Sequence, residues 1–161
     1  MKKRFLLILL SVFVSMSYAS ITVGARTSVG YGLDVDGNPS GQPVFGISGY
    51  CEIGFIGGDF VENQFAVRPE ISTTFAYSPL TVKLPLVWIF EPKSYIDLGV
   101  GAGPMFSFFK GGFGFTADAF LGFKAGPGKV VIDLCADFTF SKPESAYIHP
   151  MVALGYQYRV Y

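Results

Sequence analysis

His149 is the only histidine of the chain, and three side chains that could act with it precede it in the sequence: Ser141, Glu144 and Ser145. A histidine, a serine and a carboxylate can carry out acyl transfer when their side chains converge. Nothing in this spacing makes them converge, and a histidine at the rim of a strand structure commonly belongs to a solvated polar lining. We therefore expect no catalytic residue.

Asp34, Asp36 and Asn38 have the spacing with which a calcium-binding loop begins. The rest of that motif is absent, because Pro39 stands where the loop requires glycine and Phe45 where it requires the closing glutamate. Asp, Asn and Pro also favour turns for purely conformational reasons. We expect a loop at this place and no metal ion.

Gly99, Gly101 and Gly103 alternate along the chain, but no helix follows them, so they do not form a nucleotide-binding loop. In a strand they share one face. We expect them to make room for large neighbours such as Tyr50 or Phe120. No cofactor is predicted.

The charged residues that lie in the alternating segments of the chain all occupy the same position in that alternation. Side chains of a strand point alternately to its two faces, and every charged residue within the alternating segments of this chain falls on one phase of the alternation. Six basic residues oppose six acidic ones, namely Arg26, Arg68, Lys83, Lys124, Lys129 and Arg159 against Glu52, Glu70, Asp97, Asp118, Asp133 and Asp137. Because a buried unpaired charge is costly, we expect a paired network.

Two parts of this network are predicted to lie together. The first comes from three adjacent strands and consists of Arg26, Glu52, Arg68 and Glu70. The second comes from the sixth and seventh of the eight strands and consists of Asp118, Lys124, Lys129 and Asp133.

Turn-forming residues divide the chain into eight alternating segments. Each is long enough to cross a bilayer as a tilted strand. Their approximate bounds are 21–33, 44–56, 65–77, 80–90, 95–108, 113–125, 129–141 and 148–161, with corners expected at 78–79 and 91–94. The expected fold is an all-β, eight-stranded, antiparallel up-and-down barrel.

The opposite, charge-free phase is too bulky and too aromatic to fill a small lumen, so we expect it to face lipid. With both termini at the periplasmic side, its aromatic residues collect at two rims, as in transmembrane barrels. The outer loops are expected to be short.

The first 19 residues have the features of a secretory signal peptide. Lys2, Lys3 and Arg4 precede an apolar run from Phe5 to Val14, and a small-x-small site ends at Ala19. The run is too short for a spanning helix. We expect residues 1–19 to be removed and residues 20–161 to form one domain.

Composition narrows the function further. Removing three of the 12 basic residues leaves nine against 12 acidic ones, which argues against nucleic acid as a partner. The mean hydropathy of +0.43 is high for a secreted soluble protein. Cys51 and Cys135 fall on opposite phases, so we expect two free thiols rather than a disulfide.

These features together resemble the small eight-stranded bacterial outer-membrane barrels of the OmpX and OmpA transmembrane-domain type. The most specific part is the C-terminal sequence, which is similar to the aromatic signal read by the barrel-assembly machinery and includes Tyr156, Tyr158, Val160 and Tyr161. That signal usually ends in Phe with an aromatic residue two positions earlier, whereas here Tyr158 stands three from the end. The resemblance implies an integral outer-membrane monomer in a Gram-negative-type envelope.

The predicted function is therefore a non-enzymatic outer-membrane barrel with a filled lumen and a structural or surface-interaction role. Three alternatives remain open. They are a narrow channel for ions or small solutes, a lipid A-modifying enzyme that uses His149, since small outer-membrane barrels include such enzymes, and a secreted soluble barrel that binds a lipid.

Overall fold

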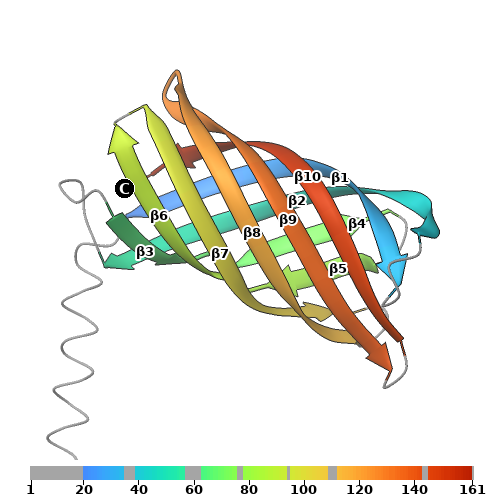
Figure 1. Cartoon of the computed structure of the whole chain (residues 1–161). Coiled ribbons are helices and arrows are strands. Elements are labelled where there is room, and N and C mark those ends of the chain that lie inside the picture. Colours follow the sequence, from blue (N-terminus) through green and yellow to red (C-terminus); the bar gives the residue numbers. More distant parts are fainter. Residues whose placement is uncertain are drawn as a thin grey trace, which may run out of the picture.

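The computed structural model describes residues 20–34, 39–56, 63–75, 78–93, 95–108, 112–142 and 145–160. Nearly all of them lie in antiparallel strands (Figure 1). The strands are β1 (Ile21–Asp34), β2 (Pro39–Ile56), β3 (Asn63–Val67), β4 (Glu70–Thr74), β5 (Ser78–Lys83), β6 (Leu86–Lys93), β7 (Ile96–Ser107), β8 (Gly112–Ala125), β9 (Gly128–Lys142) and β10 (Ser145–Arg159).

The sheet closes on itself, because β1 pairs with both β2 and β10. β3 and β4 occupy one position of the wall, and β5 and β6 occupy the next, since β3 pairs with β6 and β4 with β5. The wall is thus a ring of eight, and the predicted barrel is confirmed. Figure 1 shows the start of β1, the C-terminus and the β6–β7 and β8–β9 connections at one end, which we call the terminal end.

Two wall positions, each predicted as one continuous strand, are interrupted at prolines. Pro69 separates β3 from β4, and Pro85 separates β5 from β6. Proline has no N–H group to donate. Each proline carbonyl still accepts one bond across the gap, at 3.0 Å from the amide of Cys51 and at 3.0 Å from the amide of Arg68.

Pro104 continues this line on β7, where its carbonyl accepts a bond of 3.0 Å from the amide of Leu84. At three successive contacts between neighbouring strands, therefore, a proline carbonyl accepts a hydrogen bond but the proline cannot donate the N–H bond that would complete the pair. The interruptions flank two inward cations, Arg68 and Lys83.

Several connections differ from their expected positions because strand pairing extends further. Ser78 pairs with Thr74, so the predicted corner at 78–79 lies within β5. Lys93 pairs with Ile96, so most of the predicted turn at 91–94 belongs to β6. β2 begins at Pro39, inside the predicted first loop.

The tight connection between β8 and β9 matches its sequence. Ala125 pairs with Gly128, which leaves Gly126 and Pro127 as the turn. Gly126 has a φ of 62°, a conformation that suits glycine. Proline then fixes the next φ near −65°. This combination is the one a type II′ hairpin turn requires.

Alternation places large apolar side chains outside. Phe75, Leu134 and Leu154 are among the most exposed, at 74%, 60% and 58%. Aromatic side chains are exposed near both ends of the barrel, with Phe106, Phe113 and Phe140 far from the termini and Phe65, Trp88, Phe123, Tyr156 and Tyr158 near them. In the described residues, no helix is long and apolar enough to span a membrane.

Among the predicted space-making glycines, Gly99 lies against the ring of Phe120 as expected. Tyr50 instead lies over Gly24, so that part of the prediction was wrong. Gly103 lies against the backbone of Leu84 and Pro85, where the wall bends at its interruption.

Gly103→Ala should destabilise the barrel by about 1–3 kcal/mol, because its Cβ would overlap backbone that cannot rotate away. Gly49→Ala is the matched control, since the nearest atom to its Cβ is 4.0 Å away. Urea unfolding of the refolded protein in lipid vesicles measures both. Equal midpoints for the two variants would contradict the close approach at Gly103.

Candidate functional site: a charged lumen with a polar mouth

Arg68 is the centre of the lumen and is 1% exposed. Its guanidinium donates to Glu52 at 2.9 Å through Nη2 and to Asp118 at 2.8 Å through Nη1. The Cζ atom lies 4.4 Å from the centre of the Phe120 ring and 5.1 Å from that of Tyr50. Arg68 thus combines charge-assisted hydrogen bonds with cation–π contacts.

Arg26 lies beside this centre and is paired in the same way. It donates to Glu70 and Asp133 through its two terminal nitrogens. Its Nε donates to Ser48 at 3.2 Å. Asp133 also lies 4.0 Å from Nη1 of Arg68, so it joins the two arginines into one network.

Lys83 extends the network away from the terminal end. Its ammonium lies 2.7 Å from Asp137 and 3.7 Å from Glu70. The hydroxyl of Thr116 donates to Asp137 at 2.8 Å. Each of these three buried cations therefore contacts at least two carboxylates, as a low-dielectric interior requires.

Two apolar clusters share the lumen with the network. The cluster on the side of the terminal end consists of Ala66, Val87, Ile89, Phe120 and Val131. The cluster toward the other end consists of Val44, Cys135 and Met151. Cys135 pairs across strands with Asp118, so ion pairs and apolar side chains are mixed along the lumen.

A second charged group lies at the terminal end. Lys129 donates to Asp97 and, at 3.3 Å, to Glu91. Arg159 lies 3.7 Å from the same Glu91 oxygen. These groups line a polar pocket of about 330 Å³, together with Thr22, Glu52, Gln64, Ile89, Lys124, Pro127, Gly128 and Gln157. We call this pocket the mouth.

The first predicted group lies together as two ion pairs that a residue from outside the group connects. Arg26 contacts Glu70, Arg68 contacts Glu52, and Asp133 bridges the two pairs. Barrel strands are tilted, so residues that meet across the lumen come from positions that parity alone does not specify.

The second predicted group is wrong. Asp118 pairs with Arg68 and Asp133 with Arg26. Lys129 pairs with Asp97 and Glu91 instead. Lys124 is exposed at the mouth rather than buried in the lumen, because its Cα pairs directly with that of Lys129 at the last turn, where two like charges repel each other.

Glu91 was missed because it was assigned to a turn. Its parity, shared with Lys83, Val87 and Ile89, is the signal that could have placed it in the lumen. Glu91 thus adds a seventh carboxylate to the six that were predicted for the lumen.

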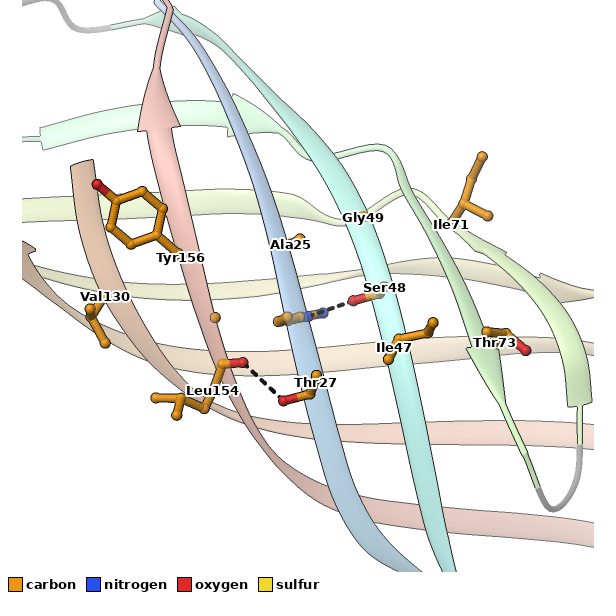
Figure 2. Close-up of a pocket in the computed structure, with 12 residues that line it drawn as sticks. Ala25, Thr27, Ile47, Ser48, Gly49, Ile71, Thr73, Val130, Leu154 and Tyr156 are labelled. Atoms are coloured by element: carbon orange, nitrogen blue, oxygen red, sulfur yellow. Dashed lines mark hydrogen bonds between the residues drawn. The ribbon is translucent and has the colours of Figure 1, made fainter. Parts of the chain in front are cut away.

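The outer wall offers little chemistry. Figure 2 shows an open depression over β1, β2 and β10, where small side chains such as Ala25, Thr27 and Gly49 stand among larger apolar ones. The hydroxyl of Thr27 donates to the carbonyl of Leu154 at 3.4 Å, so this outward polar group is bonded within the wall.

His149 lies next to this network, and the side chains of the other candidate groups fall outside the described residues. The rings of His149 and Tyr147 stack at 6.5 Å between centroids, and His149 pairs across strands with Asp137. The side chains of Ser141, Glu144 and Ser145 lie outside the described residues, as do those of Asp34, Asp36 and Asn38. Among described residues, no group of three or more His, Cys, Asp or Glu side chains could hold a metal ion.

Cys51 and Cys135 are free, as predicted. The outward residues of the C-terminal sequence, Tyr156, Tyr158 and Val160, are exposed. Tyr161 lies outside the described residues.

A closed antiparallel wall with an apolar outside and a charged inside defines the class of small eight-stranded transmembrane β-barrels. The sequence matches no known family profile, and no curated protein is significantly similar to it. A chain from the de novo design of transmembrane β-barrels aligns over 86% of this chain and 95% of its own, with a TM-score of 0.54 and 14% identity. The fold assignment rests on the wall and on this alignment.

Two natural barrels align more loosely. One is Ail, the attachment invasion locus protein of Yersinia pestis, solved with the heparin analogue sucrose octasulfate, at a TM-score of 0.47 and 19% identity over 87% of this chain and 97% of Ail. The other is Neisserial surface protein A, at a TM-score of 0.45 and 13% identity over 85% and 97% of the two chains.

Arg68→Met should destabilise the barrel by about 3–5 kcal/mol, because it leaves Glu52 and Asp118 without their partner. Arg159→Met is the control and should change stability by less than about 1 kcal/mol, because its partly exposed side chain is solvated. Urea midpoints in vesicles measure both.

Adding Glu52→Gln and Asp118→Asn to Arg68→Met should restore part of the lost stability, since it removes the uncompensated charges. A fully additive loss in the triple variant would contradict the network.

Proposed function

We propose that this chain is an integral protein of a bacterial outer membrane, without enzymatic activity, that acts as a closed structural barrel and presents its rims for surface interactions. The observation that carries the proposal is the coincidence of an apolar outer face with a lumen that holds paired charges and two apolar clusters. The first suits a hydrocarbon environment, and the second supports a lumen closed by its own side chains.

The connections far from the termini favour the structural part of this role. They are residues 35–38, 75–77, 108–111 and 143–144, each no longer than four residues. Recognition in barrels usually uses loops carried on the rigid wall. Since so little chain lies between these strands, a large binding surface beyond the membrane is not expected.

The route to the membrane is part of the same proposal. Residues 1–19 act as a cleaved signal peptide, and the barrel-assembly machinery reads the C-terminal sequence ending in Tyr161. The folded product is a monomer whose main partner is outer-membrane lipid. The outward apolar residues and the two aromatic ends support this arrangement.

Single-channel recording in planar bilayers tests the closed lumen. The inserted wild-type barrel should give no discrete current steps, because paired charges and two apolar clusters, which include Phe120 and Met151, occupy the lumen. The double variant Phe120→Ala, Met151→Ala is the comparison and should conduct. Wild-type steps that change size in Lys83→Gln would overturn the proposal in favour of a narrow channel.

A further inference from the structure

The mouth has a polarity that the closed-barrel role does not use. Its acidic groups Asp97 and Glu52 are almost fully buried, with 2% and 5% of their side chains exposed. Its basic groups lie further out, with Lys129 at 21%, Arg159 at 41% and Lys124 exposed. Glu91, 28% exposed, lies between these levels and contacts both Lys129 and Arg159, so the floor of the pocket is acidic and its outermost groups, Lys124 and Arg159, are basic.

One floor atom lacks a partner. Oδ2 of Asp97 accepts from Lys129, but Oδ1 is buried and has no hydrogen-bond partner among the described residues. Asp97 lines the mouth, and a rotation of its carboxyl group would bring this oxygen to the pocket floor. A buried carboxylate oxygen without a donor is costly, and an ammonium group of a ligand would satisfy it.

The sum of the charges limits what the ligand can be. Three acidic and three basic side chains line the mouth, namely Glu52, Glu91 and Asp97 against Lys124, Lys129 and Arg159. A ligand with one sign of charge would meet repulsion at one level of the pocket. A zwitterion that enters with its ammonium first would be complementary at both levels.

We propose that the mouth binds a phosphoethanolamine-type zwitterion, with the ammonium on Asp97 and the phosphate between Lys124 and Arg159. The volume of about 330 Å³ is at the lower end of the range of roughly 300–1,000 Å³ for small-ligand sites. Aromatic residues Phe123, Tyr156 and Tyr158 are exposed near the same rim, and aromatic belts mark the level of lipid headgroups.

This proposal depends on the proposed function in one respect, which is that the rim of the mouth lies at a membrane surface. A phospholipid headgroup and the free zwitterion share the chemistry. In a phospholipid, the ammonium is the end furthest from the acyl chains, so it can reach the floor while the chains stay in the bilayer.

The experiment uses the mature barrel folded in an uncharged maltoside detergent, with soluble phosphoethanolamine as the probe. The side-chain amides of Gln64 and Gln157 line the mouth and serve as NMR reporters. Saturable shifts are expected. They should weaken by about tenfold or more in Asp97→Asn, since a hydrogen bond to a charged group is lost. Lys124→Gln, an exposed change that leaves the fold intact, should weaken binding less.

Asp137→Asn is the matched control, because it makes the same change in the lumen away from the mouth. A second arm adds phosphatidylethanolamine or phosphatidylglycerol to the micelles. Shifts with the soluble probe and with phosphatidylethanolamine support a headgroup site, and shifts with the soluble probe alone support a site for the free zwitterion.

Three results would overturn the proposal. They are the absence of saturable shifts with either form, equal binding of inorganic phosphate, and binding that Asp97→Asn and Lys124→Gln leave unchanged. None of them bears on the closed lumen, which the current recordings test separately.

Discussion

The structure depends on one constraint, which is that a single layer of strands separates two incompatible surroundings. Because successive side chains point to opposite faces, the wall holds apolar groups such as Ile47 and Leu134 outside and charged groups such as Arg68 inside. A shift of one residue in phase would exchange these two sets. The closed ring also pairs the strand edges, which an open sheet in lipid could not do.

The lumen follows from the same constraint. Its inward charges are removed from water, so Arg26, Arg68 and Lys83 each contact two or more carboxylates. Tyr50 and Phe120 cover the faces of the Arg68 guanidinium and bring apolar volume into the same layer. The closed ring brings these strands opposite one another, and the pairing is required there because a cation that loses its partners inside a barrel is costly.

The phase of the strands could be predicted from sequence because parity is a local property. Even the weakly contrasted residues Val87 and Ile89 point inward as expected from Lys83. The partners could not be predicted, since contacts across the lumen depend on strand tilt. Asp133 therefore meets Arg26 rather than Lys129. The interruptions at Pro69 and Pro85 were missed because both prolines were taken as ordinary residues of continuous strands. The inward position of Glu91 was missed because this residue was taken as the start of a turn.

The most direct test of the account is the electrophoretic mobility of the protein in SDS, from isolated outer membranes or after refolding in detergent, with and without boiling. A closed wall whose apolar face is already covered by detergent should stay folded in cold SDS, so the unboiled protein should migrate differently from the boiled one. A single mobility, together with solubility in buffer without detergent, would contradict the assignment of the apolar face to lipid and would favour a secreted lipid-binding barrel.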